Sequence, residues 1–332
     1  MSVVEPVPII QVGLGPWGLD WARTVLASSD AVTVVARVDS DPERAASLGR
    51  EVATYTSLGE ALANTSAQAV LITARIEAHH GLAREALSAG RHVLLEKPFT
   101  VTVAQAQDLN ELAANRERVL CVAQNYRFWP VIQAARELLA QQVLGDLENV
   151  QIRFRRDHPN YGPSVTAPAG APTGSILYQI SVHHIDLIRA LLGEVREVTA
   201  RRWQRTALPG RLTALSALFR LESGLLVDYN ADQASRAIET PWSGEWTIEG
   251  TAGQLRFAGG PTTDDAVLEL TRDQTTSSLP IPEPTLGDRE QVLADFVAAI
   301  RGGVESPLAG SNNIRTLQAV LDTVESIQAD QA

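Results

Sequence analysis

The only lysine of the chain, Lys97, lies in the segment HVLLEKPFT, and the other 27 of the 28 basic residues are arginine. A guanidinium has a pKa above about 12, so an arginine does not exchange protons at neutral pH. A lysine ammonium releases its proton far more readily when it is desolvated or lies near another cation. Lys97 is therefore a candidate for acid–base chemistry that an arginine cannot perform. The alternative is a lysine without a role, and its surroundings have to decide.

A second candidate group is an imidazole in the segment YQISVHHID, which predicts a helix. Gln179 and His183 are four residues apart and therefore share a face of that helix. This face is polar, so His183 is a candidate general acid or base. His184 falls on the apolar side and is predicted to be a core histidine. Asp186 orients His183 or the substrate, or it pairs with Arg189; both alternatives stay open.

A glycine-rich turn precedes a predicted helix near the start of the chain. The segment VGLGPWG places Gly13, Gly15 and Gly18 in G-x-G-x-x-G spacing directly after an apolar run. In a dinucleotide-binding turn the first glycine allows the tight turn, the second admits the pyrophosphate, and the third permits close helix–strand packing. The helix N-terminus adds partial positive charge, and Pro16 is suited to its first turn. The pattern predicts a dinucleotide site.

A carboxylate follows at the distance that such a site requires. Asp39 lies 21 residues after Gly18, at the end of the second apolar run. A carboxylate there binds the adenosine ribose diol and repels a 2′-phosphate, which favours NAD. Ser40 and the nearby Arg44 leave NADP as the alternative cofactor.

The composition limits the class of protein. A net charge of -11 argues against nucleic-acid and anionic-membrane surfaces, and 45% apolar with 20% charged residues is typical of a globular protein. The length of 332 residues predicts two domains. Cys121 is the only cysteine and lies in the apolar run RVLCVA, so we expect a buried strand residue and a reducing compartment. The start has no basic segment of a signal peptide, and the expected location is the cytoplasm.

The first 124 residues alternate short apolar runs with amphipathic stretches of helix length. The runs are VPIIQV, VTVVARVD, QAVLIT, HVLLE and RVLCVAQ. This alternation predicts a doubly wound parallel sheet of the Rossmann type, covered by helices on both faces. Lys97 then ends the fourth or fifth strand, at the carboxyl edge where such sheets bind ligands. That place favours a functional lysine.

Residues 125–332 follow a different pattern and form the predicted second domain. Long alternating runs with turn signals predict a large, mostly antiparallel open sheet, so the domain is α+β. The histidine helix is expected to end at Gly193, and two last helices at about 288–301 and 311–328. Residues 157–174 are rich in proline and glycine and predict a long loop.

Ordered motifs along the chain resemble the Gfo/Idh/MocA family of oxidoreductases (glucose–fructose oxidoreductase, inositol dehydrogenase, rhizopine catabolism). ALSAGRHVLLEKPFT is similar to the family's E-K-P signature, and GSILYQISVHHIDLIRALLG resembles its D-x-x-x-H helix. IIQVGLGPWG looks like the nucleotide-binding opening. The resemblance implies a nicotinamide-dependent oxidoreductase with a Rossmann domain and a second, sheet-containing domain.

The resemblance also implies roles for single residues. Lys97 and His183 are implied as the catalytic pair, and the Lys97–Pro98 peptide as often cis. The implied cofactor-binding residues are Gly13, Gly15, Pro16, Trp17, Gly18, Asp39, Ser40, Thr73, Arg75, Glu96, Lys97 and Gln124. The implied substrate-binding residues are Lys97, Asn125, Tyr126, Arg127, Gln179, His183 and Asp186. His79, His92 and His158 are expected to be structural, with the nicotinamide pocket as the alternative place for His79. No histidine or cysteine cluster has the spacing of metal ligands.

Two departures from the family pattern bear on function. Gln179 occupies the position of a frequent aspartate, and TARIEAHH lacks the proline of the usual T-P-x turn. An amide can orient a substrate hydroxyl but cannot take its proton. The predicted function is hydride transfer between NAD and a secondary alcohol or carbonyl of a sugar, inositol or related polyol. The alternatives are a catalytically inactive dinucleotide-binding sensor and a dihydrodiol-type dehydrogenase. A homodimer or homotetramer is expected.

Overall fold

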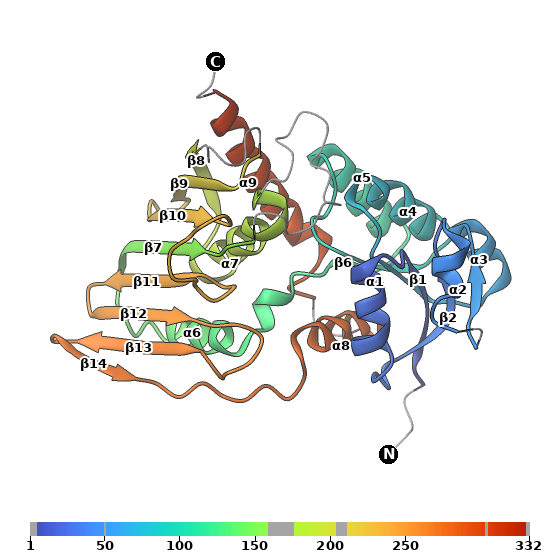
Figure 1. Ribbon diagram of the computed structural model, residues 1–332, viewed down its shortest axis with the longest axis horizontal. Coiled ribbons are helices and arrows are strands. Elements are labelled where there is room, and N and C mark those ends of the chain that lie inside the picture. The colour runs from blue at the N-terminus through green and yellow to red at the C-terminus, as the bar shows by residue number, and fades with distance from the viewer. Residues whose placement is uncertain (1–4, 50, 159–175, 204–210, 303–304, 330–332) are drawn as a thin grey trace. The chain divides into compact units, whose positions relative to one another are not determined.

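The computed structural model describes residues 5–49, 51–158, 176–203, 211–302 and 305–329 (Figure 1). The chain divides into two compact units. Unit 1 contains Met1–Gln124 and Arg289–Leu317, and unit 2 contains Asn125–Asp288 and Gln318–Ala332. Each unit has its own sheet, one parallel and one mostly antiparallel, which confirms the predicted fold class.

Unit 1 is built on six parallel strands in the order β3-β2-β1-β4-β5-β6. The apolar runs of the sequence form the buried strands, because a parallel sheet that is covered on both faces excludes water from its side chains. The edge strand Ala53–Tyr55 was not predicted, because it is short, largely exposed and has no apolar run. The strands are β1 (Val7–Val12), β2 (Val32–Val38), β3 (Ala53–Tyr55), β4 (Ala69–Ile72), β5 (His92–Leu95) and β6 (Leu120–Val122).

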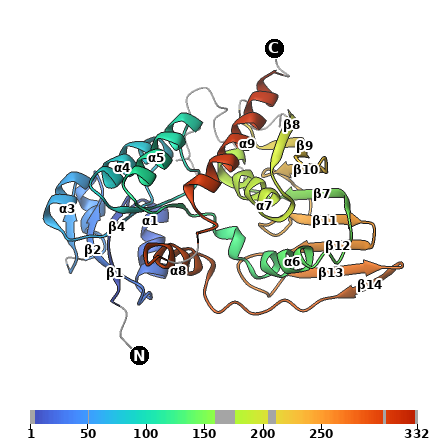
Figure 2. The same cartoon turned by 180° about the vertical axis from the view of Figure 1, so that it is seen from behind.

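Helices cover both faces of this sheet, with α4 and α5 on one face and α1 and α8 on the other (Figures 1 and 2). Several of them begin at a capping side chain: Asp41, Ser57 and Thr102 each accept a hydrogen bond from a backbone N–H of the first helical turn. The helices are α1 (Pro16–Asp20), continued by the π-helical η1 (Trp21–Leu26), α2 (Pro42–Ala46), α3 (Leu58–Asn64), α4 (Ile76–Ser88), α5 (Val103–Asn115) and α8 (Asp288–Ile300).

Residues Arg289–Leu317 group with unit 1, although their sequence pattern placed them in the second domain, 125–332. The returning segment adds backbone pairing to the edge strand β6, since Val122 donates its N–H to Leu308 at 2.8 Å. Helix α8 buries Val292 and Phe296 on its apolar face. An amphipathic pattern predicts such a helix but does not say which core it joins.

Unit 2 contains eight strands in the order β14-β13-β12-β11-β7-β10-β9-β8. Neighbours are antiparallel except for β7 and β10, which run parallel. The exposed β14 was not predicted. The strands are β7 (Leu147–Arg155), β8 (Val195–Arg202), β9 (Ala214–Leu221), β10 (Leu226–Asp232), β11 (Glu245–Gly250), β12 (Gly253–Ala258), β13 (Val267–Arg272) and β14 (Thr275–Ser278).

The alternating residues of these strands place their apolar members in one core with α6, α7 and the last turns of α9. The helices are the 3₁₀ turn η2 (Asn125–Phe128), α6 (Pro130–Ala140), the π-helical η3 (Leu177–Ser181), α7 (Val182–Leu192) and α9 (Gly310–Ala329), whose first turns belong to unit 1. In both views these helices of unit 2 lie on one side of its sheet (Figures 1 and 2).

The histidine helix forms where it was predicted and ends at Gly193, which has a positive φ of 112°. Its first turn is π-helical rather than α-helical, and π turns are frequent at functional sites. Of the loop expected at 157–174, the structure describes only Asp157 and His158; the rest lies outside the described residues. Among the helices that the structure describes, none is long and apolar enough to span a membrane.

Candidate active site

The glycine turn between β1 and α1 has the geometry of a dinucleotide cradle. A Cβ on Gly13, whose φ is +90°, would lie 2.6 Å from the backbone nitrogen of Ala74, and a Cβ on Gly18 would lie 1.9 Å from the carbonyl oxygen of Gly13. In contrast, no atom of the described residues lies within 4 Å of a Cβ built at Gly15. The first and third glycines are therefore required by packing, while the second leaves room for a ligand.

Two polar side chains hold this turn. The hydroxyl of Thr73 donates to the carbonyl of Gly13 at 2.6 Å, and the amide of Gln11 donates to the carbonyl of Gly18 at 2.7 Å. Gln11 was missed in the sequence because it lies inside an apolar strand. Arg75, the other predicted residue of this region, precedes α4 and is exposed.

Asp39 lies at the carboxyl end of β2, buried and joined to the glycine turn. Its Oδ2 accepts the N–H of Leu14 at 2.7 Å, and its Oδ1 accepts the N–H of Asp41 at 2.9 Å. A carboxylate oxygen has further lone pairs, so these bonds orient the group and leave acceptor capacity for a ribose diol. Ser40 is exposed, and Arg44 pairs with Asp41 at 3.4 Å. The residues fit an adenosine ribose without a 2′-phosphate.

Lys97 follows β5 at the same carboxyl edge, and its peptide bond to Pro98 is cis, as the resemblance implied. Burial lowers the pKa of its ammonium from 10.5 to about 8, while the negative charge of Glu96 acts in the opposite direction. The carboxylate of Glu96 accepts the indole N–H groups of Trp17 and Trp21 and the backbone N–H of Lys97. Gln124, also predicted at this edge, is buried just after β6.

The other histidines have partners within the fold. His79 is buried, with Nδ1 2.9 Å from the carbonyl oxygen of Pro98 and Nε2 3.0 Å from that of Ala74, so it braces the segment after Lys97. Burial lowers its pKa. His92 accepts the N–H of Val119 at 3.0 Å, and burial lowers its pKa to about 4.

In unit 2, the imidazole of His183 is held by an aromatic stack. The centroid of the Tyr126 ring lies 3.9 Å from that of the His183 ring, at an interplanar angle of 5°. It also lies 3.6 Å from the ring centroid of Trp129, the residue between η2 and α6. Stacked rings restrict the rotation of the imidazole. The sequence indicated Tyr126 but not Trp129.

Arg127 and Asp186 form a buried pair. Nε and Nη2 of Arg127 lie 2.5 Å and 2.8 Å from the two carboxylate oxygens of Asp186. Arg189, the partner that helix spacing offers to Asp186, binds Glu194 with the same two-bond geometry. Two planar groups gain more from a bidentate contact than from the single contact that helix spacing offers.

Asn125 lies at the start of unit 2, where its amide donates to the carboxylate of Asp288. The same carboxylate oxygen accepts the indole N–H of Trp129 at 2.9 Å. Asp288 is 163 residues away in sequence and had no motif to indicate it. This contact fixes the turn that also carries Tyr126.

Gln179 is buried on η3, and a polar network continues along this helix into the core. His184 has Nε2 2.8 Å from the carbonyl oxygen of Trp242 and Nδ1 2.9 Å from the hydroxyl of Tyr229, which lies 2.7 Å from Ser181 Oγ. Burial lowers the pKa of His184 to about 4, so the ring is neutral, and its Nε2 donates to the Trp242 carbonyl. His184 has the surroundings of the core histidine that was predicted.

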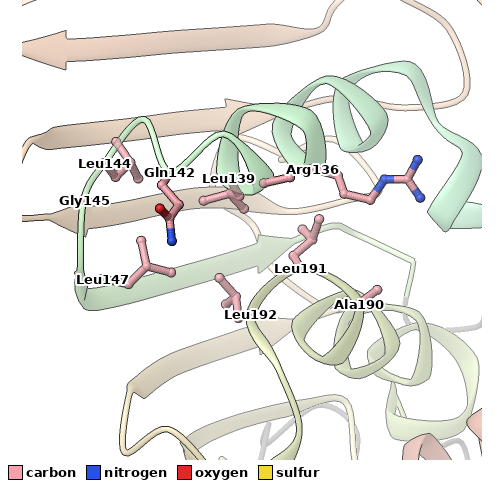
Figure 3. Close-up of a pocket in the computed structure, with 10 residues that line it drawn as sticks. Arg136, Leu139, Gln142, Leu144, Gly145, Leu147, Ala190, Leu191 and Leu192 are labelled. Carbon is pink, nitrogen blue, oxygen red and sulfur yellow. The ribbon is translucent and has the colours of Figure 1, made fainter.

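A pocket of about 320 Å³ opens in unit 2 between the ends of α6 and α7 (Figure 3). Leu139, Leu191 and Leu192 point into it, and none of the predicted site residues lines it. The predicted residues instead fall into two groups: the dinucleotide residues and Lys97 in unit 1, and Asn125, Tyr126, Arg127, Gln179, His183 and Asp186 in unit 2. Among the described residues, no three His, Cys, Asp or Glu side chains gather as metal ligands do.

Two family models match successive parts of the chain. Residues 8–124 match an oxidoreductase family with an NAD-binding Rossmann fold, and residues 132–256 match the Gfo/Idh/MocA C-terminal domain. The boundaries of the first match agree with the part of unit 1 that carries the glycine turn, Asp39 and Lys97.

Curated relatives are similar over different shares of the chain. An uncharacterized oxidoreductase of Schizosaccharomyces pombe is 31% identical over 52% of this chain, which spans under half of that relative, 47%. D-apiose dehydrogenase of Paraburkholderia graminis is 25% identical over 88% of this chain and 80% of its own. 1,5-anhydro-D-fructose reductase of Ensifer adhaerens is 24% identical over 95% of this chain and 97% of its own length.

A solved structure has the same fold. An oxidoreductase from Agrobacterium radiobacter, in complex with NAD⁺, L-tartaric acid and magnesium, superimposes with a TM-score of 0.83 at 20% identity, covering 98% of this chain and 97% of that one.

Two substitutions separate packing from ligand binding in the glycine turn. We expect Gly15→Ala to leave the free energy of unfolding within about 0.5 kcal/mol of the parent, because its Cβ meets open space. It should nevertheless raise the dissociation constant for NADH about tenfold, since the methyl group occupies the place of the pyrophosphate. Gly18→Ala should instead destabilise unit 1 by about 1–3 kcal/mol. Calorimetry and NADH fluorescence measure both effects, and equal destabilisation by the two variants would contradict the assignment.

A second pair of substitutions tests the buried ion pair. Asp186 is 1% exposed, whereas Glu197, which binds Arg220 at 2.7 Å, is 62% exposed. We expect Asp186→Ala to lower the free energy of unfolding by about 3–5 kcal/mol, because the Arg127 guanidinium loses its carboxylate in a buried place. The matched control Glu197→Ala should change it by at most about 1 kcal/mol. Chemical denaturation gives both values, and a small effect of Asp186→Ala would show that this pair does not hold the site.

Proposed function

Because the chain belongs to the Gfo/Idh/MocA family of oxidoreductases, we propose that it transfers a hydride between NAD and a secondary alcohol or carbonyl carbon of a sugar, inositol or related polyol. The observation that carries the proposal is the single lysine of the chain, partly buried at the carboxyl edge of an NAD-binding sheet with a pKa lowered to about 8. Two relatives that match most of their own length are named as acting on sugars, which supports the substrate class.

The residues of unit 1 fit the dinucleotide. The open space at Gly15 and the N-terminus of α1 would admit the pyrophosphate, and the Asp39 carboxylate would bind the ribose diol. When bound, the nicotinamide supplies or accepts the hydride. NAD rather than NADP is proposed because Asp39, buried and fixed by two backbone N–H groups, would repel a 2′-phosphate.

Lys97 and His183 would act on the oxygen of the reacting carbon. In the oxidation direction, His183 accepts the hydroxyl proton at a ring nitrogen, and the ammonium of Lys97 stabilises the alkoxide as its charge develops. In the reduction direction the imidazolium returns that proton. The stack on Tyr126 keeps the imidazole in one orientation, and Gln179 and Tyr126 orient other hydroxyl groups of the substrate.

Gln179 is the residue on which the rival function depends. In place of the family's usual aspartate it carries no charge, so it can orient a hydroxyl but cannot tune the pKa of a neighbour. A dinucleotide-binding sensor would need no proton acceptor there. Incubating the protein with NAD and a broad panel of polyols, while the absorbance of NADH is recorded, separates the two: reduction of NAD supports the enzyme, and binding without reduction supports the sensor.

Replacing the amine tests the role of Lys97. We expect Lys97→Arg to bind NADH with nearly the parent affinity and to lower kcat by about 10² to 10⁴, because a guanidinium keeps a positive charge but differs in size and geometry from the ammonium that stabilises the alkoxide. Steady-state kinetics with the substrate found in the panel measures the loss. A variant that turned over at nearly the parent rate would remove Lys97 from the mechanism.

A second copy of the chain is proposed to pair with the open face of the unit 2 sheet. Paired residues of neighbouring strands form a row there, in which the exposed Leu218 lies beside polar side chains. The row is Leu218, Asp228, Gln151, Thr247 and Arg256.

The cytoplasmic location rests on the lone cysteine and stays a prediction.

Charge on this face should therefore change the oligomeric state. We expect sedimentation velocity to give a dimer or tetramer for the parent and mostly monomer for Leu218→Glu, because a buried unpaired carboxylate opposes association. The control Leu286→Glu changes another exposed leucine, outside the strands, and should leave the state unchanged. A monomeric parent would contradict the proposal.

A further inference from the structure

The side chain of Glu96 is surrounded by hydrogen-bond donors. Its Oε1 lies 2.6 Å from the indole nitrogen of Trp17 and 2.7 Å from that of Trp21, and its Oε2 lies 3.0 Å from the backbone nitrogen of Lys97. The residue is 5% exposed. An ionised carboxylate only accepts hydrogen bonds, and bonds to a charged acceptor are shorter and stronger than neutral ones. Three donors around one buried group therefore call for a carboxylate ion.

These bonds join two segments that are far apart in sequence. Trp17 and Trp21 lie in α1 and η1, directly after the glycine turn, and are 79 and 75 residues from Glu96. Lys97 is the next residue in the chain and follows β5. One carboxylate thus fixes the helix that would face the pyrophosphate and the backbone of the proposed catalytic lysine.

Other charged groups lie around this cluster. The guanidinium of Arg289, on α8, lies 4.6 Å from the ring centroid of Trp17 and 5.6 Å from that of Trp21, and it binds Asp20 at 2.6 Å. His79, on α4, interacts electrostatically with Glu96. Arg289 is thus paired with Asp20, and the negative charge of Glu96 acts on the Lys97 ammonium.

We propose that Glu96 is a positioning residue through which dinucleotide binding at the glycine turn and the charge of Lys97 depend on the same carboxylate. This inference rests on the proposed function in one respect only, the role of Lys97 in turnover. Without the carboxylate, burial lowers the pKa of the ammonium further, so the proton of Lys97 is lost at lower pH. Glutamine cannot replace it, because its NH₂ group would face either the indoles or the Lys97 N–H, donor against donor.

The single lysine allows a direct measurement. Protein grown with lysine labelled by ¹³C at Cε gives one lysine signal, whose chemical shift follows the charge of Lys97 without any substrate. We expect the parent to titrate at about pH 8. Glu96→Gln should lower this midpoint by about 1 unit or more, the usual effect of losing an adjacent opposite charge. Trp21→Phe removes a donor but no charge and should leave the midpoint in place.

Dinucleotide binding provides the second readout. Glu96→Gln, Trp17→Phe and Trp21→Phe should each raise the dissociation constant for NADH about 5- to 10-fold, because each loses a bond that fixes the helix after the glycine turn. Trp203→Phe, at an exposed tryptophan of unit 2, is the control and should bind NADH as the parent does.

Glu96→Asp keeps the charge but shortens the side chain by one methylene, so it should weaken NADH binding and keep a midpoint near that of the parent. If Glu96→Gln does not fold, Glu96→Asp, Trp17→Phe and Trp21→Phe still test whether dinucleotide binding depends on Glu96. Normal NADH affinity in all three variants overturns that dependence. If Glu96→Gln folds and titrates at the parent pH, the effect on Lys97 is overturned. Neither readout involves turnover, so a protein that binds NAD without catalysis would give the same results.

Discussion

Burial of the Lys97 ammonium, opposed by the adjacent Glu96 carboxylate, is the interaction on which the proposed function of this protein depends. Burial alone makes the charged form costly, and the neighbouring negative charge favours it, so the pKa settles at about 8 rather than at 10.5. An arginine in the same place would stay charged throughout. The parallel sheet of unit 1 provides the place, because the carboxyl ends of its strands bring Lys97 to the same edge as the glycine turn and Asp39.

Much of the fold could be predicted because most strands coincide with apolar or alternating runs of the sequence and most helices with amphipathic stretches. The elements that escaped prediction, α2, α3, β3 and β14, have only three to seven residues, and periodicity cannot be recognised in so few. Residues Arg289–Leu317, placed in the second domain from their sequence pattern, group with unit 1 for another reason. An apolar helix face shows that a helix packs, but its partner is decided by long-range contacts such as that between Val122 and Leu308.

The site follows the same rule. Local spacing indicated the glycine turn, Asp39, Lys97 and His183, since each belongs to a motif of a few residues. It did not indicate Trp21, Trp129 or Asp288, which matter through contacts with residues 75 to 163 positions away. The partner of Asp186 shows why: helix spacing offers Arg189, but Arg127 reaches it with two parallel bonds from the start of unit 2. The ion-pair partner of a long side chain is decided by geometry in space, whereas spacing in sequence indicates only the partners on the same helix.

Lys97 and His183 are proposed to act on one substrate oxygen. The most direct test is a crystal structure of the protein with NADH and a polyol that it oxidises. We expect Lys97 Nζ and a ring nitrogen of His183 both to lie about 2.6–3.2 Å from the oxygen of the reacting carbon in that complex. A complex in which the amine of Lys97 faces solvent, or in which another residue occupies its place beside that oxygen, would contradict it.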